Sequence, residues 1–254
     1  MRALTVIIPT YNEEDNIDEL LQLVQWANEI IVIDSFSTDK TIEIAQQYNI
    51  KLLQRKYTGP ADQKNWAIPQ ASHTWVLMLD ADERPTPKLT KEIQDFLTGT
   101  EEDYAAFWIG RKSYFMGQAI KYSGWQDDKV IRLFKRDVCR YNNKQVHEEI
   151  ETTEKVGKLQ HSLEHYTYKN LNHFLDKMRR YAKWSALDYA PKTTKVTLFH
   201  LWGKPLFRFF KHYIIKRGFL DGKAGFIISI IMAWGVFLRY TFLKEMHLQS
   251  KKNQ

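Results

Sequence analysis

The sequence predicts an α/β fold, with a mostly parallel central sheet flanked by helices and a helical C-terminal extension. Three observations predict it. Short apolar runs rich in β-branched residues alternate with helical patterns over residues 1–100, and shorter aromatic runs separated by Gly and Asn follow over residues 103–163. From residue 201 onward the chain of 254 residues is basic and aromatic. Alternating strands and helices are typical of βαβ units with right-handed crossovers.

The first hundred residues are expected to form strands and helices in strict alternation: strand 4–9, helix 17–24, strand 29–34, helix 38–48, strand 51–55, helix 63–71, strand 74–79 and a helix from residue 86 or 87. Asp15 or Asn16 is expected to cap the first helix, and Thr86 the last, because short polar side chains accept hydrogen bonds from a first helical turn. Pro87 suits the first turn of a helix. Ligands of such sheets lie beyond the carboxyl ends of the strands.

The second half of the chain shows a different pattern. Residues 103–163 predict a mixed or antiparallel extension of the sheet, and residues 170–189 predict a helix. The apolar stretch 224–238 has fifteen uncharged residues, fewer than the ~20 that span a bilayer. We expect a pair of interfacial helices there, with cations facing anionic lipid. A helix buried against the main domain and a short re-entrant hairpin are the alternatives.

Charge and cysteine content narrow the possible partners. The net charge is +7, and residues 201–254 hold ten Lys or Arg against Asp221 and Glu245, so residues 1–200 sum to about −1. The C-terminal segment alone is therefore expected to meet an anionic partner, membrane lipid or nucleic acid. The single cysteine, Cys139, excludes an intrachain disulfide and fits a reducing compartment. The first residues lack the pattern of a signal peptide, so export is not expected.

The strongest single motif is TWVLMLDADERPTP, in which a buried strand ends in two carboxylates. In an extended chain Asp80 and Asp82 would point in opposite directions, so one is expected to orient a ribose hydroxyl and the other to bind a hard cation. Mg²⁺ and Mn²⁺ accept one or two carboxylates together with diphosphate and water oxygens. The alternative is a turn cap before Pro85. The position at a strand end, in register with PTYNEEDN and with Asp34, favours the ligand site.

The segments VIIPTYNEEDNI, IVIDSFSTDKT, QKNWAI and WVLMLDADE resemble, in order and spacing, the signature of family 2 glycosyltransferases. The match covers nearly all of residues 1–100 and implies the GT-A fold. It implies a nucleoside-binding set, with Asp34 on the base: Pro9, Tyr11, Glu13 and Asp34. It also implies that Lys64 and Asn65 line the nucleotide and its phosphates. Asp80 and Asp82 match the D-x-D motif of the family, with Asp82 as the metal ligand. Ser35 and Phe36 depart from the second motif, where the family has a further acid and a Gly.

GWQDDKVIRLFKR resembles the segment in which these enzymes carry the catalytic acid shortly before an Arg-Leu pair. The resemblance implies Asp128 as the general base, with Asp127 as the alternate. An inverting enzyme needs one base, which takes the proton from the acceptor hydroxyl. The alternative is that both acids form a charged turn with Lys129 and Arg132. Arg132 itself either faces phosphate or is solvated.

QVHEEI lies where a His of related enzymes joins the metal or the diphosphate, which implies His147 as a metal ligand with Glu148 beside it. The alternative is a hydrogen-bonded surface histidine. His161 and His165 show no spacing with a third ligand and are expected to be structural.

GWQDDKVIRLF, VHEEI and GKAGF also resemble bacterial lipopolysaccharide core β-glucosyltransferases. We therefore expect a metal-dependent inverting transferase that uses Mg²⁺ or Mn²⁺. It would move a hexose, glucose by this resemblance, from a UDP-linked donor to a lipid-linked or lipopolysaccharide-core acceptor. Residues 1–165 would form the catalytic domain, with 1–100 for the nucleotide sugar and 101–165 for the acceptor, and residues 166–254 the helical region. The expected location is the cytoplasmic face of a bacterial inner membrane, peripheral or monotopic.

Other functions fit less well. A nucleic-acid partner is not expected, because the main domain is near neutral and its acids cluster at strand ends, where they would repel phosphate. A nucleotidyltransferase would carry a Gly-rich basic loop where this chain has TYNEED. A polyprenyl-phosphate or other cell-envelope polysaccharide glycosyltransferase, and a non-catalytic membrane scaffold with a GT-A fold, remain the alternatives.

Overall fold

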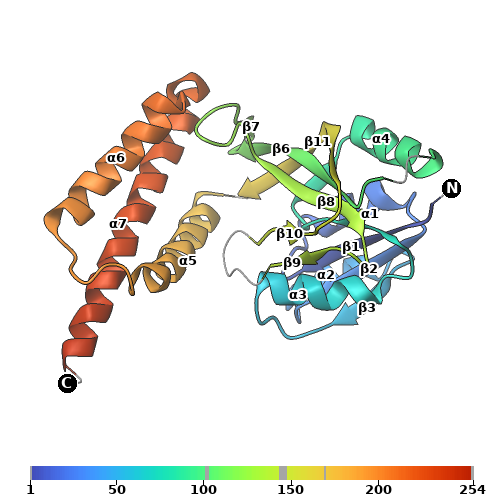
Figure 1. Ribbon diagram of the computed structural model, residues 1–254, viewed down its shortest axis with the longest axis horizontal. Helices are drawn as coiled ribbons and strands as arrows, with labels where there is room; N and C mark the ends of the chain where they lie inside the picture. Colours follow the sequence, from blue (N-terminus) through green and yellow to red (C-terminus); the bar gives the residue numbers. More distant parts are fainter. Residues whose placement is uncertain (1, 101–102, 143–147, 169, 253–254) are drawn as a thin grey trace. The chain divides into compact units, whose positions relative to one another are not determined.

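The computed structural model describes residues 2–100, 103–142, 148–168 and 170–252, which divide into two compact units (Figure 1). The first unit is Met1–Lys112 with Asp128–His165, and the second is Ser113–Asp127 with Tyr166–Gln254. The chain passes from one unit to the other within strands β6 (Ala106–Phe115) and β11 (Val156–Tyr168), and again between Asp127 and Asp128.

The first unit begins with a parallel sheet, which confirms the predicted alternation of strands and helices. Its strands lie in the order β3-β2-β1-β4. The elements, in chain order, are β1 (Leu4–Thr10), α1 (Ile17–Val24), β2 (Glu29–Asp34), α2 (Thr41–Ala45), β3 (Lys51–Gln54), α3 (Pro60–Ala67), the 3₁₀ turn η1 (Ile68–Gln70) and β4 (Trp75–Met78).

Antiparallel strands extend this sheet beyond β4, as predicted for residues 103–163. β8 (Lys129–Lys135) pairs antiparallel with β4 and with β6, and β11 follows β6 in the strand order. The far edge is β5 (Glu83–Pro85), a three-residue strand that pairs with β11 and precedes helix α4 (Pro87–Thr98). β9 (Arg140–Tyr141) and β10 (Ile150–Glu151) form a separate two-stranded sheet.

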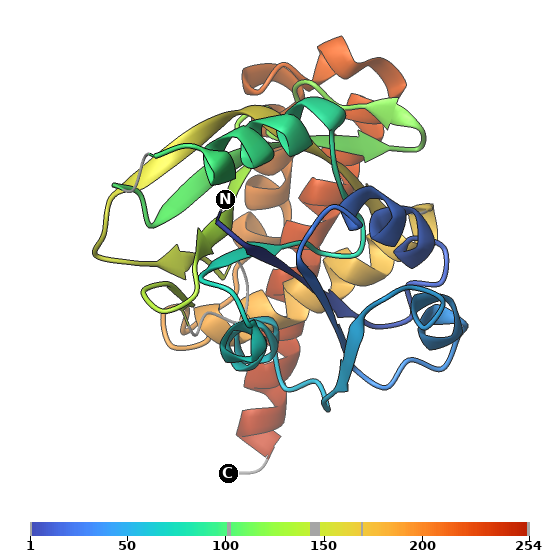
Figure 2. The same cartoon turned by 90° about the vertical axis from the view of Figure 1, so that its right-hand side faces the viewer.

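The core of the first unit lies on both faces of the parallel strands. Side chains of a strand alternate between its two faces. Val6 and Ile8 of β1 therefore pack with α1 and α4, whereas Ile7 packs with α3, and all three are fully buried. Figure 2 shows α2 and α3 on opposite sides of β1, β2 and β3. Helices on both faces leave the carboxyl ends of the strands as the open edge for ligands.

The helix starts agree with the sequence in part. Thr86 caps α4 as predicted, since Leu89 N donates to its Oγ1 at 3.2 Å, and Pro87 follows at the first helical position. α1 begins directly after Asn16, but the Asn16 side chain makes no capping hydrogen bond. Its Nδ2 instead donates to Glu13 Oε2 at 2.7 Å. Asn16 therefore occupies the predicted N-cap position without the capping hydrogen bond that was expected of its side chain.

The second unit is mainly helical. α5 (Leu171–Tyr189) confirms the predicted helix, and Asn170 caps it by accepting from His173 N at 2.9 Å. The π-helical turns η2 (Phe199–Gly203) and η3 (Lys211–Ile215) flank α6 (Lys204–Phe210), and the 3₁₀ turn η4 (Gly218–Asp221) leads into α7 (Gly222–Lys252). α5 and α6 both pack along α7 (Figure 1). β7 (Gln118–Ala119) pairs with the end of β6.

The C-terminal helix is longer than the apolar stretch predicted from the sequence. By length and composition alone, the helical segment Gly218–Ser250 could cross a membrane, with a mean hydropathy of 1.8 over its most apolar window. The uncharged stretch is short, but the helix continues through the charged residues at its ends. Part of the segment is buried within the second unit, around Ile228 and Tyr240.

Candidate active site

The polar residues predicted at the strand ends are brought to one edge of the first unit by the parallel register. Thr10, the last residue of β1, lies opposite Asp34, the last residue of β2. Pro9 lies opposite Ile33, within β1. β4 lies on the other side of β1, with Met78 opposite Ile7. The carboxyl ends of these three strands therefore open at the same edge.

Asp34 is fully buried, and its carboxylate closes the turn that follows β2. Both of its oxygens accept from Ser37, through the backbone N–H and the hydroxyl, and Gln54 Nε2 donates to it at 3.1 Å. The structure thus shows Asp34 as the anchor of the loop DSFSTD. Its predicted contact with a nucleoside base stays a prediction.

Two loops join beyond β1 and β2. Asn12 N donates to Ser37 Oγ at 2.9 Å, and Glu13 N donates to Thr41 Oγ1 at 2.8 Å. These bonds hold the two loops together. Two aromatic side chains of the loops remain exposed to solvent, Tyr11 at 57% and Phe36 at 54%. The rim of the site therefore offers two rings against which a flat ligand can stack.

Lys64 and Asn65 are adjacent in α3, but Lys64 binds carboxylates whereas Asn65 binds backbone groups. Lys64 is buried and its Nζ binds Glu148 Oε1 at 2.9 Å and Asp80 Oδ1 at 3.1 Å. Burial alone would lower the pKa of Lys64, but the Asp80 carboxylate outweighs burial and the pKa is raised. The Asn65 amide both donates to and accepts from the backbone of Tyr141, at 2.8 Å each, and so fastens α3 to β9.

Arg132 is buried in β8 and binds two carboxylates, so it is neither solvated nor part of a surface turn. Its guanidinium contacts Asp80 and makes hydrogen bonds to Glu83, which is fully buried. The two alternatives of a charged turn and of a solvated Arg132 are therefore wrong, because β8 is a central strand and Arg132 pairs with the acids that follow β4. Burial opposes ionisation of Asp80, but Arg132 and Lys64 hold its pKa well below the usual range.

Asp128 is held by Arg111 of β6 through both carboxylate oxygens. Arg111 Nε lies 3.0 Å from Oδ2 and Nη2 lies 2.9 Å from Oδ1. This two-point pairing is the strong geometry of guanidinium and carboxylate. A charged turn of Asp128 with Lys129 and Arg132 is therefore wrong. Asp127, the alternate, is exposed and belongs to the second unit.

A continuous set of ion pairs joins these groups. Arg111 Nη1 reaches Glu83 Oε1 at 3.1 Å, and Glu83 binds Arg132 in turn. We call this set the ion-pair chain, and its members in order are Asp128, Arg111, Glu83, Arg132, Asp80, Lys64 and Glu148. Sequence reasoning missed Arg111 and Glu83. For Glu83 the sequence offered one signal, its position directly after the D-x-D motif.

Asp82 lies beside His165. The chain makes a turn here, with Glu83 N donating to Asp80 O at 2.9 Å, so it is not extended as assumed. Asp82 Oδ2 is 3.4 Å from His165 Nε2, because β11 pairs His165 opposite Glu83. His165 was expected to be structural only. It is part of the surroundings of the predicted metal ligand.

The metal site predicted at Asp82 has one described carboxylate and one neighbouring histidine, His165. His147 lies outside the described residues, so its predicted role stays a prediction. Among the residues that the structure describes, no group of three or more His, Cys, Asp or Glu is placed to hold a metal ion. Mg²⁺ commonly binds through one or two carboxylates and takes its other ligands from substrate phosphates and water. Asp82 supplies one carboxylate of this kind.

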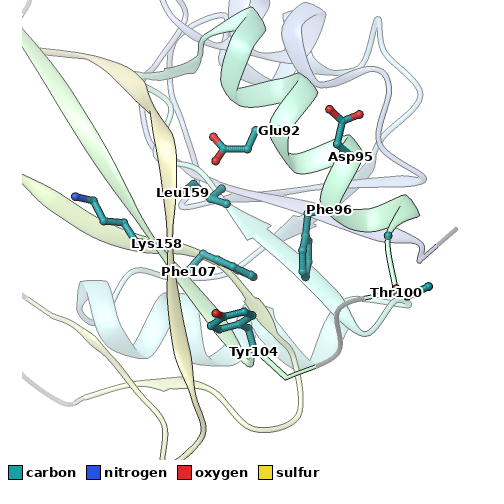
Figure 3. A pocket seen from close by; sticks show the side chains of 9 residues that line it. Glu92, Asp95, Phe96, Thr100, Tyr104, Phe107, Lys158 and Leu159 are labelled. Carbon is teal, nitrogen blue, oxygen red and sulfur yellow. The ribbon is translucent and has the colours of Figure 1, made fainter.

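A separate hollow lies between α4 and strands β6 and β11. Figure 3 shows its lining, with the rings of Phe96, Tyr104 and Phe107 beside Lys158 and Glu92. Its volume is about 500 Å³. The site residues predicted in the described part of the chain are not among those that line it.

Known proteins share this fold and this sequence pattern. The family model described as "Glycosyl transferase family 2" matches residues 5–157. An uncharacterized glycosyltransferase of Rickettsia typhi is 29% identical over 99% of this chain and 90% of its own length. The lipopolysaccharide core biosynthesis glycosyltransferase LpsC of Rhizobium meliloti is 26% identical over 98% of this chain and 95% of its own length.

A solved structure resembles the whole chain. A crystal structure of an S. aureus TarS fragment in complex with UDP-GlcNAc is 16% identical, covers 99% of this chain and 92% of its own, and gives a TM-score of 0.50. The likeness concerns the fold. The predicted α/β fold of GT-A type is confirmed.

Proposed function

The chain belongs to glycosyl transferase family 2, and from this premise we propose that it is an inverting, metal-dependent transferase. It moves a hexose from a UDP-linked sugar to a lipopolysaccharide-core or other lipid-linked acceptor. The observation that carries the proposal is the ion-pair chain, which ties the D-x-D acid Asp80 to the predicted base Asp128 through Arg132, Glu83 and Arg111.

On the donor side, the exposed rings of Tyr11 and Phe36 lie at the rim of the edge where family members bind the nucleoside. Asp82, together with His147, would hold Mg²⁺ or Mn²⁺. When bound, the ion neutralises charge that develops on the departing diphosphate. Lys64 stays charged at neutral pH, because its pKa is raised, and it keeps Asp80 fixed beside the site.

On the acceptor side, Asp128 takes the proton from the attacking hydroxyl. A carboxylate does this when it lies within hydrogen-bond reach of that hydroxyl. Arg111 holds both oxygens of Asp128, so the carboxylate has one orientation before the acceptor arrives. One base suffices for a displacement that inverts the anomeric carbon.

The acceptor class rests on a relative that matches nearly end to end. LpsC is named for lipopolysaccharide core biosynthesis, and the match spans 98% of this chain. This supports a lipopolysaccharide-core acceptor and, with the resemblance of the sequence to core β-glucosyltransferases, glucose as the sugar.

The second unit supports a location at the cytoplasmic face of the inner membrane, peripheral or monotopic. Its segment from residue 198 to 220 exposes large apolar side chains, with Leu198 76% and Trp202 72% exposed. The same stretch carries Lys204, Arg208 and Lys211. Apolar side chains beside cations are the pattern of segments that lie in the headgroup region of anionic lipid. We call residues 198–220 the lipid-facing segment. Its further exposed apolar members are Phe199, Leu206, Phe207, Phe210, Ile214, Ile215, Phe219 and Leu220.

Thermal shift of the purified protein with UDP-, GDP- and ADP-sugars, with and without Mn²⁺ or Mg²⁺, tests the donor and the metal together. We expect stabilisation by one UDP-sugar that requires the metal and is lost in Asp82→Ala. The matched control is Asp95→Ala, which removes an exposed acid of α4 and leaves the shift intact. A folded protein that responds to no nucleotide sugar contradicts the proposal and favours a scaffold.

A further inference from the structure

Asp221 is a buried acid in the most basic part of the chain. It is one of two acids against ten Lys or Arg in residues 201–254, and it is 3% exposed. A buried carboxylate is costly unless hydrogen bonds satisfy its oxygens. The partners of Asp221 come from the segment Ser113–Asp127, about a hundred positions earlier in the chain.

Both oxygens of Asp221 accept hydrogen bonds from one turn of that segment. Lys121 N donates to Oδ1 at 3.0 Å, and Tyr122 N and Ser123 Oγ donate to Oδ2 at 3.0 and 2.7 Å. Hydrogen bonds to an ionised carboxylate are roughly twice as strong as neutral ones. The backbone carbonyl of Asp221 adds a fourth bond, accepting from Gln118 Nε2 at 3.1 Å.

Residues that precede Asp221 in the chain also form hydrogen bonds with the turn at Ser123. Ser123 N donates to Lys216 O at 3.1 Å, and His212 Nδ1 donates to Ser123 O at 2.8 Å. A Cβ on Gly218 would lie 2.8 Å from His212 O and 3.1 Å from Ser123 Oγ, so a larger residue does not fit there. Ser123 is fully buried.

Apolar side chains of the segment Ser113–Asp127 also pack against helices of the second unit. Ile120 belongs to a buried cluster with Phe174 of α5 and Ile228 of α7. Trp125 packs against this cluster and lies 6.5 Å from Phe174 between ring centroids. We call residues 118–125 the anchored loop, since the helices of the second unit hold its polar and apolar groups.

We propose that Asp221 is a positioning residue for the acceptor half of the reaction. The anchored loop runs directly into Asp127 and Asp128, so its position sets the path of the chain at the base. The inference rests on the proposed role of Asp128. The C-terminal helices then have a task besides membrane contact, because they hold the loop from which the catalytic carboxylate follows.

The donor residues predicted from the sequence lie elsewhere in the chain, at the ends of β1, β2 and β4. Loss of the anchor therefore changes acceptor use and spares donor binding. A displacement of about 1 Å at a reacting group can cost up to about 100-fold in rate. We expect kcat/KM for the acceptor to fall about tenfold or more in Asp221→Asn, with the donor KM unchanged. Asn keeps the shape but turns an N–H toward groups that are themselves donors.

The test uses the full-length protein, with Tyr240→Phe as the matched control. Tyr240 is buried in the same unit, and the variant loses the hydrogen bond from Lys204 Nζ to the Tyr240 hydroxyl, 2.7 Å long, which does not involve the loop. Three measurements are compared: thermal shift with UDP-glucose and Mn²⁺, UDP release without acceptor, and transfer to detergent-solubilised lipopolysaccharide with a truncated core. Hydrogen–deuterium exchange over residues 113–127 reports the loop directly.

The expected result is faster exchange in the anchored loop and reduced transfer in Asp221→Asn, with donor shift and UDP release retained, and neither change in Tyr240→Phe. Unchanged exchange, or an equal fall of donor and acceptor parameters, overturns the proposal. A wild-type protein that neither binds UDP-glucose nor releases UDP overturns the proposed function and this role with it. If the wild type releases UDP but does not transfer to this lipopolysaccharide, exchange decides: a loop as protected in Asp221→Asn as in the wild type overturns the role of Asp221.

Discussion

Glu83 binds Arg132 at both carboxylate oxygens, with Nε 2.9 Å from Oε2 and Nη2 2.8 Å from Oε1, and both side chains are buried. The same carboxylate accepts from Arg111 at 3.1 Å. One buried acid thus bridges two guanidinium groups, and each of these pairs with a further acid of the site. The geometry of the ion-pair chain depends on this residue at its centre.

Replacing Glu83 by Gln is expected to destabilise the first unit by about 3 kcal/mol or more, because it removes the buried negative charge that Arg111 and Arg132 share. Urea unfolding measures the change. Glu19→Gln is the control, since Glu19 pairs with Arg84 but is largely exposed, and exposed pairs contribute under about 1 kcal/mol. Equal effects of the two substitutions contradict the central role of Glu83.

The two adjacent acids before β8 are expected to differ in catalysis. Asp128→Asn should lower the transfer rate by roughly 100- to 10,000-fold, the range for loss of a general base, while the thermal shift with donor persists. Asp127→Asn should stay near the wild-type rate, because Asp127 is exposed and is the weaker candidate. Steady-state rates with circular dichroism as the check on folding separate the cases. The reverse order would move the base to Asp127.

Acid is expected to destabilise the second unit through His212. Burial, with Arg208 and Lys211 nearby, lowers the pKa of His212 from its ordinary 6.5. A group with a lowered pKa in the folded state contributes stability that is present above about pH 6.5 and is lost as the pH falls through the folded pKa. Its Nε2 accepts from Arg208 at 3.3 Å when neutral, and protonation would place two positive groups together.

Denaturant unfolding of the wild type and of His212→Gln at pH 7.5 and pH 5.5 tests this. The wild type should lose more unfolding free energy over this interval than the variant does. His200 also has a lowered pKa, but it is present in both proteins, so its contribution cancels. Identical losses contradict the assignment to His212.

The lipid-facing segment is expected to drive binding to anionic vesicles. Trp202→Ser with Phe207→Ser should weaken vesicle binding at least about tenfold, since full burial of one large apolar side chain contributes about 1.5–3 kcal/mol. Co-sedimentation with vesicles containing phosphatidylglycerol measures it. Leu187→Ser, in an exposed position of α5, is the control and should bind normally. If the double variant binds as well as the control, another surface makes the contact.

The sequence predicted the parallel half of the fold well because its signals are local. Apolar strands such as Trp75–Met78 and the cap at Thr86 depend on neighbouring residues, and the acids at the strand ends follow from the same pattern. The second helix was predicted too long, since α2 covers only Thr41–Ala45. It starts late because Thr38 and Asp39 form hydrogen bonds with the loop after β1. Local propensity does not reveal such competition.

The missed parts of the site depend on pairing between distant strands. β5 has three residues and no periodic pattern, yet its pairing with β11 brings His165 beside Asp82. Likewise, Arg111 meets Asp128 only because β6 and β8 pair antiparallel. An arginine in a strand carries no sign of its partner until the register is known. The predicted site residues at the strand ends were therefore accessible from sequence, and the groups that orient them were not.

The interleaved chain path also imposes an order of events on the ribosome. Gln118 and Asp221 are 103 positions apart, yet they bond to each other, and Phe115 and Ile120 are buried in a cluster with Phe174 of α5 and Ile228 of α7. At about 5–20 residues per second, the nascent loop waits roughly 5 to 20 s for its partner to be synthesised. Over that interval the backbone N–H groups of Lys121 and Tyr122 lack the carboxylate that binds them in the folded protein.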